Sequence, residues 1–500
     1  MWFDSPDSDR GTGVERALVK YFVRMAGRCT PFGLFAGGSV GSLGEQTRLE
    51  LQERGCYRRH TRLDMDFLSA LVDGLNRDPD LRRELRFRPN SSLYRLGDRV
   101  RYAEARLQGR VRSYFLVVAD ADEFLRSTLE RAAGGARRAE LARGLVDDQI
   151  TLQEAEAYVD ELIDSQILVP DLAPAVTGRE SIDDVLVQLR DKKSTREVTR
   201  TLDSVREGLA QLDRDGLGAG ASRYREIAAS LKDLPADTDI AKLFQVDMTK
   251  PAARMQLGMD VVHLMMQGVE ILHRLFGAGP KDALEGFRSA FKERYGDREL
   301  PLVEVLDEEI GIGFGASKAP GADASPLLAG PAFPARPDER TRPVNARTAF
   351  LRWKLAETLA AGKPEMVLTD EELALFETSN LLPLPDAFHV TAAVLPADTT
   401  HPGPRLLVSG AGGPSGARLL GRFCHADAEL REMVLGHLRQ EEALRADCTH
   451  FEIVHLPEGR IGNILARPLF REYELAFLGR SGAAPDRQLD IRDLTICLDG

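Results

Sequence analysis

The sequence predicts an α+β fold with mixed sheets, helical subdomains and one embedded winged-helix-like element. Three observations indicate this class. Residues 92–117 read as short strands separated by glycine-containing turns. From about residue 120 the apolar residues recur at helical spacing. A long helical stretch covers roughly 180–295, with the strand-like segment LFQVDM at 243–248 inside it. An alternating strand pattern then returns in AFHVTAAVLP at 387–396 and continues in RLLVS and HFEIVHL.

The composition is that of a globular chain. Its 500 residues suggest about three structural units, and 43% apolar with 29% charged residues exclude wholesale disorder. A net charge of −12 argues against a protein that is positive everywhere, but it leaves room for a local basic groove. The sequence contains no run of 18 apolar residues, so we expect no membrane span. Five scattered cysteines, an odd number without a pattern, favour a reducing cytoplasmic location: Cys29, Cys56, Cys424, Cys448 and Cys497.

The first predicted element is a helix over 14–26, with Leu18, Phe22 and Met25 on one face. The segment CTPFGLFAGGSV then breaks the helix at Pro31, because proline cannot continue the helical hydrogen bonding. The glycines lead from this break into an apolar run.

The winged-helix-like element is predicted at 92–171. Three short strands (SLYRL, VRYAEA and SYFLVV) are followed by three amphipathic helices and the closing strand ILVPDL. Such a fold can bind either nucleic acid or a peptide. The winged-helix-like element follows a predicted amino-terminal region at 1–91 and precedes a helix-rich region at 172–315. A Pro/Gly/Ala-rich linker or loop is predicted at 316–343, and an α+β continuation at 344–500.

The segment RMAGRCTPFG at 24–33 concentrates polar chemistry. Arg24 and Arg28 are four residues apart, which stacks two guanidinium groups on one side of a helix. Two stacked guanidinium groups can bind phosphate oxygens or a carboxylate. Thr30 offers a hydroxyl where the helix must end. The alternative is an exposed arginine pair on a surface helix.

A second basic region lies between Arg82 and Arg112. Ten arginines stand there against Glu84, Asp98 and Glu104, a local charge of +7. This asymmetry suits a polyanion backbone, while the alternative is a charged, solvated face of a sheet.

Other chemistries are not indicated. The Cys424-His425, Cys448, His450 and His455 intervals match no common zinc pattern, so no metal is expected. The glycine-rich segments at 311–315 and 409–418 lack the Lys-Ser/Thr of a phosphate-binding loop, so no bound cofactor is expected.

The sequence resembles the amino-terminal, glutamylating part of the lantibiotic dehydratase family. The segment RMAGRCTPFGLFAGGSVG at 24–41 is close to the family signature R-x3-R-x-TPFGLFAG. Further blocks follow in the family order: RLDMDFL at 62–68, FQVDM at 244–248, FKERYGDRELPLVEVLDEEIGIGFG at 291–315, LLGRF at 419–423 and NILARPLFREYEL at 463–475.

The resemblance implies a tRNA-dependent glutamyl transferase. Such enzymes esterify Ser and Thr side chains of a ribosomal precursor peptide with glutamate from glutamyl-tRNA, the co-substrate. They then eliminate glutamate to leave dehydroalanine or dehydrobutyrine. The implied partners are the leader and core of the precursor peptide, glutamyl-tRNA, a lanthipeptide cyclase or a separate elimination-domain protein, and a second copy in a homodimeric full-length form.

The resemblance also assigns residues. The glutamylation site would comprise Arg24, Arg28, Thr30, Asp64, Asp247 and Arg422. Contacts to tRNA would come from Arg24, Arg28, Arg82, Arg83, Arg86 and Arg88. Asp64 or Asp247 could act as a base toward the attacking hydroxyl, or could hold the arginines in an ion pair. The winged-helix stretch resembles the leader-recognition element of the family, in which the leader adds a strand to a sheet.

Departures from the family pattern leave alternatives open. The extreme amino-terminal family segment and an elimination domain are missing, so we expect a fragment of a larger product or a split enzyme that does not dehydrate alone. One alternative is a peptide–aminoacyl-tRNA ligase of the same superfamily. Another is an inactive remnant that only binds a leader peptide.

Overall fold

The computed structural model describes residues 9–28, 30–108, 111–276, 283–314, 346–375, 383–395, 397–399, 402–418, 420–457 and 461–498. The chain forms two compact units, one of Met1–Val261 with Asp386–Asp493, the other of Val262–Pro385 with Leu494–Gly500. Helices and small sheets alternate in the described parts, which confirms the predicted α+β class. The linker predicted at 316–343 lies outside the described residues, and the other domain boundaries stay predictions.

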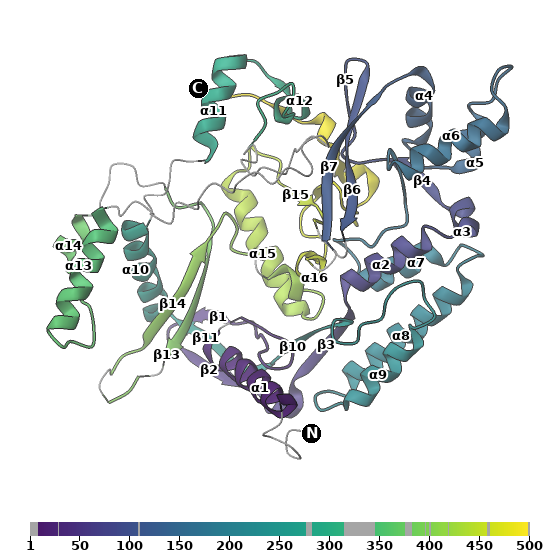
Figure 1. Cartoon of the computed structure of the whole chain (residues 1–500). Helices are drawn as coiled ribbons and strands as arrows, with labels where there is room; N and C mark the ends of the chain where they lie inside the picture. Colours follow the sequence, from purple (N-terminus) through teal and green to yellow (C-terminus); the bar gives the residue numbers. More distant parts are fainter. Residues whose placement is uncertain are drawn as a thin grey trace. The chain divides into compact units, whose positions relative to one another are not determined.

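The first unit opens with helix α1 (Asp9–Gly27), drawn in purple in Figure 1. The helix is longer than the stretch predicted at 14–26, and its last turn carries Arg24. The predicted face of Leu18, Phe22 and Met25 is 43–64% exposed. Strand β11 (Ala252–Gly258) lies between β1 (Ser42–Gly44) and β2 (Arg48–Leu51), parallel to β1 and antiparallel to β2.

Strands β3 (Arg58–Leu63) and β10 (Phe244–Thr249) form an antiparallel pair from segments far apart in the sequence. Side chains alternate between the two faces of such a pair. One face packs on α8 (Arg196–Arg214), where Thr61 donates to Asp213. Helix α9 (Ala221–Ser230) packs on α8 in turn. The other face carries His60, Arg62 and Asp247.

The winged-helix-like element predicted at 92–171 contains three strands, followed by helices and a closing strand. Strands β5 (Tyr94–Leu96), β6 (Arg99–Gln108) and β7 (Val111–Asp120) form one antiparallel sheet, and β6 pairs with β7 over ten residues, longer than the short strands predicted. A second sheet has the order β8-β4-β9, so a strand that precedes residue 92 belongs to the arrangement. Its elements are β4 (Arg86–Pro89), α4 (Glu123–Ala132), β8 (Ala136–Arg137), α5 (Arg138–Arg143), α6 (Leu152–Asp164) and β9 (Leu168–Pro170).

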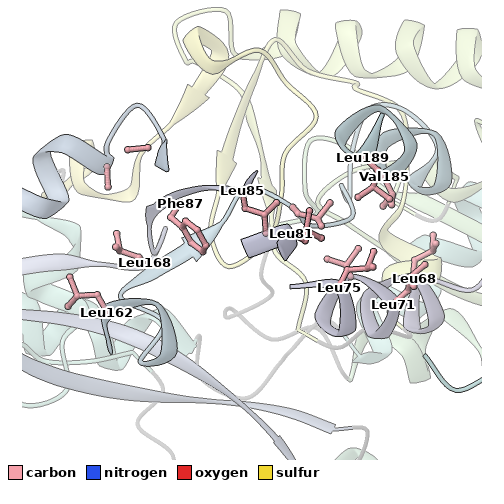
Figure 2. Packing of buried hydrophobic residues seen from close by; sticks show 14 of the residues in the cluster. Leu68, Leu71, Leu75, Leu81, Leu85, Phe87, Leu162, Leu168, Val185 and Leu189 are labelled. Atoms are coloured by element: carbon pink, nitrogen blue, oxygen red, sulfur yellow. The ribbon is translucent and has the colours of Figure 1, made fainter. Parts of the chain in front are cut away.

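One buried core joins this element to the neighbouring helices α2 (Met65–Leu75), α3 (Pro79–Glu84) and α7 (Ser181–Leu189). Figure 2 shows Leu68, Leu71 and Leu75 of α2 in the same cluster as Phe87 of β4 and Leu168 of β9. Leu71 is 0% and Phe87 1% exposed. Because each such side chain contributes about 1.5–3 kcal/mol when fully buried, this core fixes the end of β3 that leads into α2.

The first unit ends with a smaller α+β part that supplies Arg422. The hairpin of β13 (His389–Leu395) and β14 (Arg405–Gly412) confirms the strands predicted there. A short 3₁₀ turn at Gly421–Phe423 precedes α15 (Ala428–Leu444). A parallel sheet of β15 (Phe451–Val454), β16 (Tyr473–Ala476) and β17 (Gln488–Leu489) and the short helix α16 (Gly462–Leu465) complete it.

The second unit is mainly helical. Strand β12 (Leu300–Pro301) pairs antiparallel with β18 (Thr495–Ile496), and Leu275 and Leu373 form a small core with Phe350 and Leu368. Within the described ranges, none of the helices combines the length and apolarity that a bilayer span requires. The helices are α10 (Met259–Phe276, beginning in the first unit), α11 (Ala283–Tyr295), α12 (Leu302–Leu306), α13 (Ala346–Ala360) and α14 (Asp370–Ala374).

Candidate functional site

Asp247 sits between two arginines on the face of the β3–β10 pair that does not pack on α8. Arg62 Nη2 donates to Asp247 Oδ2 at 2.9 Å, and Arg422 Nη2 donates to Oδ1 at 3.0 Å. The Asp247 side chain is only 3% exposed, and those of Arg62 and Arg422 are 10% and 20% exposed. With each carboxylate oxygen accepting from a guanidinium, the arrangement favours an ion-pair role for Asp247 over proton abstraction. The group carries a net charge of +1.

We call Arg62, Asp247 and Arg422 the triad. Each of its two arginines has a hydrogen-bond donor that the triad does not use. Among the described residues, the buried Nε atoms of Arg62 and Arg422 have no hydrogen-bond partner. Arg422 also lies over the Phe423 ring, with 4.7 Å between Cζ and the ring centroid. A buried donor without a partner is costly, so these atoms suit a ligand oxygen or an ordered water.

Asp64 stands at the junction of β3 and α2. It is the N-cap of α2, and its side chain accepts from the backbone N–H of Asp66 at 2.9 Å. Its own N–H donates to the Leu243 carbonyl, which ties the junction to the start of β10. The residue is 4% exposed. Asp64 therefore has a structural role: it caps the N-terminus of α2, a position where aspartate is favoured.

Arg24 and Arg28 differ in their surroundings. Arg24 Nη2 donates to Thr30 Oγ1 at 2.9 Å, and its Cζ lies 5.0 Å from the centre of the Phe32 ring. Arg28 is exposed and follows the end of α1 at Gly27, so the two residues are not stacked within one helix as the spacing predicted. Pro31 and the left-handed Gly33 turn the chain away directly after this point.

The loop that follows Thr30 is fixed to the strand that carries Asp247. The Gly38 N–H donates to the Met248 carbonyl at 2.9 Å, and the Lys250 N–H donates to the Gly38 carbonyl at 2.7 Å. A Cβ on Gly37 would lie 2.6 Å from the Met248 oxygen, so only glycine permits this approach. The structure thus joins the Arg24–Thr30 segment and Asp247 through one strand.

A small cavity adjoins Arg62 on the same face. It offers about 20 Å³ to the centres of water-sized molecules, enough for one ordered water, and it is lined in part by Arg62, Glu180, His425 and Asn463. Asn463 accepts from the N–H of Met65 at 2.8 Å. The cavity extends the polar environment of the triad next to Arg62.

His60 and Glu180 form a hydrogen-bonded ion pair beside this cavity. Burial alone lowers the pKa of His60, but the hydrogen bond and the charge of Glu180 outweigh it and raise that pKa. Burial likewise raises the pKa of Glu180, and the bond to His60 with the charges of His60 and Arg62 brings it below its usual value. The charged forms of both groups are therefore favoured.

His425 remains neutral more readily than an ordinary histidine, because burial lowers its pKa. Its Nε2 lies 2.9 Å from the Gly178 carbonyl oxygen, which can only accept, so Nε2 carries the proton. Nδ1 is then an acceptor, and among the described residues it has no partner.

The predicted RNA-contacting arginines of the second basic region belong to other elements, α3 and β4. Arg82 pairs with Asp164 at 2.8 Å, Arg83 with Asp80 at 2.9 Å and Arg88 with Asp171 at 2.8 Å. Arg86 donates to the Gly135 carbonyl. The structure does not bring these four side chains into the triad, and three of them already face a carboxylate. Arg110 lies outside the described residues.

Sequence reasoning assigned none of His60, Arg62, Glu180 and Asn463 to the site. It named His425 only among intervals that match no zinc pattern. Arg62 stands two residues before Asp64 in RLDMDFL. Because residues two apart in a strand share one face, this spacing could have indicated that Arg62 belongs to the site. Glu180 and Asn463 reach the site only through long-range packing. Among the described residues, no cluster of three or more His, Cys, Asp or Glu side chains is arranged to hold a metal ion.

Comparison with known proteins finds relatives that match nearly the whole chain. The subtilin biosynthesis protein SpaB of Bacillus subtilis is 23% identical over 510 residues, which cover 99% of this chain and 47% of SpaB. The chain thus spans about half the length of this relative. The nisin biosynthesis protein NisB of Lactococcus lactis subsp. lactis is 24% identical over 306 residues, which cover 59% of this chain and 29% of NisB.

A solved structure shares the fold over nearly the whole chain. The tRNA-dependent lantibiotic dehydratase MibB from Microbispora sp. 107891 superposes with a TM-score of 0.75 at 22% identity, covering 98% of this chain and 48% of MibB. The family model described as "Lantibiotic dehydratase, N terminus" matches residues 2–500. The chain belongs to the family formed by the amino-terminal part of lantibiotic dehydratases.

Proposed function

We propose that this chain transfers the glutamyl group of glutamyl-tRNA to Ser and Thr side chains of a ribosomally made precursor peptide. A solved relative supports the class of reaction. The glutamylation domain TbtB from thiomuracin biosynthesis, bound to 5'-phosphodesmethylglutamycin, has a TM-score of 0.60 at 19% identity and covers 100% of this chain and 61% of its own. Elimination of glutamate would be the task of another part or partner.

The chemistry is an ester exchange. The peptide hydroxyl oxygen bonds to the glutamyl carbonyl carbon, and the bond from that carbon to the ribose oxygen breaks. The proton leaves the hydroxyl and ends on the ribose oxygen. The acyl group is already activated, so the step needs no nucleotide hydrolysis. It needs cations for the phosphates of the RNA and donors for the oxyanion that forms on the carbonyl oxygen.

One observation carries the proposal: the loop of Arg24, Arg28 and Thr30 is anchored on the strand that holds Asp247 between Arg62 and Arg422. We assign Arg24, Arg28 and Thr30 to the RNA phosphates. Arg422 and Arg62, with their buried Nε donors, are our candidates for the oxyanion. In this assignment Asp247 positions Arg422, and Asp64 positions the start of α2, so neither removes the proton.

The winged-helix-like element supports the recognition of a leader peptide. Strand β7 stands at one end of the sheet order β5-β6-β7, and its Leu116 and Val118 are 48% and 36% exposed. An extended peptide can add to such an edge through backbone hydrogen bonds, with side-chain contacts giving selectivity. We propose β7 as this edge.

The test uses the full-length protein with radiolabelled glutamyl-tRNA and the precursor peptide. We expect Arg28→Ala to abolish glutamyl transfer while leader binding persists. The matched control is Arg225→Ala, an exposed arginine on α9 outside the site. Equal transfer by Arg28→Ala and wild type would remove the arginine from the site. Leader binding without any transfer by the wild-type protein would leave only the peptide-binding role.

A further inference from the structure

Three aromatic rings gather on the surface beside Arg24. The rings of Tyr21 and Phe35 are stacked, with centroids 4.8 Å apart and planes at 4°, and Phe32 lies 6.1 Å from Phe35 and 6.2 Å from Tyr21. Tyr21, Phe32 and Phe35 are 42%, 39% and 44% exposed. We call these three residues the aromatic platform. Aromatic side chains normally bury much of their surface, so a stack with this exposure points to a binding role.

The platform is built on a closed turn. The Phe32 N–H donates to the Ala36 carbonyl at 2.7 Å, and the N–H groups of Phe35 and Ala36 donate to the Phe32 carbonyl at 3.0 and 3.2 Å. Gly33 has a φ of +50°, the left-handed region that glycine adopts without a Cβ penalty. The turn therefore presents Phe32 and Phe35 in a fixed orientation, and a ligand need not order them on binding.

Positive charge adjoins the platform. The Arg24 guanidinium lies over Phe32, is held by Thr30, and keeps a buried Nη1 that has no partner among the described residues. Arg28 is exposed in the same segment. Stacked aromatic faces next to guanidinium groups are the combination that binds unpaired nucleotides: the rings stack a base and the cations meet its phosphate.

We propose that the aromatic platform stacks the terminal unpaired base of the RNA co-substrate, while Arg24 and Arg28 contact the phosphates next to it. This inference rests on the proposed function and adds the recognition of the RNA end to it. Charge complementarity favours an RNA end over an apolar protein surface, because the guanidinium of Arg24 would be desolvated without an anion under a purely apolar partner. Stacking does not depend on hydrogen bonds to base edges, so any unpaired base can occupy the site to some degree.

The experiment combines a change in the protein with a change in the RNA. Two hairpins are compared, one ending in an unpaired CCA segment and one lacking the last nucleotide. With the wild-type protein, removal of this nucleotide should weaken binding about 5-fold or more, the value of one base stacked on an aromatic ring. With Phe35→Ala the two hairpins should bind within about 2-fold of each other, and Phe35→Trp should restore the difference.

Phe22→Ala is the matched control. Phe22 lies on the same helix next to Tyr21 and is 64% exposed, but it is not part of the stack. It should keep the wild-type dependence on the last nucleotide. Thermal denaturation of each variant shows whether the fold is retained, and Phe35→Trp keeps the test valid if Phe35→Ala unfolds.

The outcomes separate the platform from the enzymatic proposal. The platform is refuted if the last nucleotide matters equally to the wild type and Phe35→Ala, or to neither. Glutamyl transfer that proceeds alongside such a result would leave the proposed function standing. Dependence on the last nucleotide that is lost in Phe35→Ala, in a protein that transfers no glutamate, would support the platform and refute the transferase. Loss of self-association in Phe35→Ala without a change in RNA binding would instead assign the rings to a second copy.

Discussion

Arg422 donates a hydrogen bond of 3.0 Å to Asp247, across 175 residues of sequence. Arg62 donates to the other oxygen of the same carboxylate at 2.9 Å. Two separate segments of the chain are therefore held together by one buried acid. The charge of Asp247 is what allows two guanidinium groups to approach each other on this face of the β3–β10 pair.

We expect Asp247→Asn to lower the free energy of unfolding by about 3–5 kcal/mol, because it leaves two buried cations without their counter-ion. Urea denaturation monitored by circular dichroism measures the change. The control is Asp215→Asn, which breaks a more exposed pair with Arg223 and should cost less than about 1 kcal/mol. Similar losses for the two variants would mean that the triad does not hold the fold together.

The His60–Glu180 pair predicts a pH-dependent coupling. The raised pKa of His60 gives stability that is complete below the unfolded value near 6.5 and is lost as the pH rises through the folded pKa. The lowered pKa of Glu180 gives stability that is present above about 4.5 and is lost as the pH falls through the folded pKa. The coupling should therefore be greatest between about pH 4.5 and 6.5.

A double-mutant cycle with His60→Gln and Glu180→Gln measures this coupling from urea denaturation. We expect about 1.5–3 kcal/mol at pH 5.5, the range for hydrogen bonds to charged groups, and a clearly smaller value at pH 9, where His60 has lost its charge and only the hydrogen bond to Glu180 can remain. The cycle cancels the separate effects of the nearby Arg62, Asp213 and His425 charges. A coupling that does not change between the two pH values would contradict the charged state assigned to His60.

Strand β7 offers a test of leader binding. We expect the double change Leu116→Asp and Val118→Asp to weaken leader affinity at least about 10-fold, because it replaces apolar contact surface on the edge strand by charge. Fluorescence anisotropy with a labelled leader peptide measures the affinity. The control is Val146→Asp, which changes a 44% exposed residue of the winged-helix-like element outside β7 and should have little effect on leader affinity. Equal affinities for both variants would place the leader elsewhere.

The arginines of α3 and β4 can be tested by salt dependence. We predict that replacing Arg82, Arg83, Arg86 and Arg88 by Gln weakens tRNA binding and lowers the slope of log affinity against log salt concentration by at least about 0.7, the value of one phosphate contact. Arg190→Gln and Arg206→Gln serve as the control, since both arginines also pair with aspartates. An unchanged slope in the quadruple variant would identify a solvated, ion-paired surface.

The sequence predicted the elements of the site better than their relationships. The helix before Pro31, the strand-like segment at 243–248 and the strand–helix succession at 92–171 follow from local spacing and turn residues. Asp64 was expected beside the arginines as a base or an ion-pair partner. The structure shows that it also caps α2, which the pattern D-M-D-F alone does not predict. The register that sets His60 opposite Asp247 joins strands about 190 residues apart, and no local pattern encodes it.

The same limit applies to charge. Arg82, Arg83 and Arg88 gave the sequence a strong local positive charge, but Asp164, Asp80 and Asp171 face them in the fold. Only Asp80 is a close sequence neighbour. Long-range packing thus decides how much of a basic segment is available to a polyanion, and a count of residues along the chain overestimates it.

The position of Asp247 within β10 has a consequence for insertions. Gly38 bonds to Met248 on one side of this residue, and Arg62 stands opposite Gln245 on the other. One extra amino acid between them would turn the acid through half a pleat, toward Asp213 on the helical side. The guanidinium groups of Arg62 and Arg422 would then face each other without the carboxylate between them, so one inserted residue here should be at least as damaging as the loss of the acid itself.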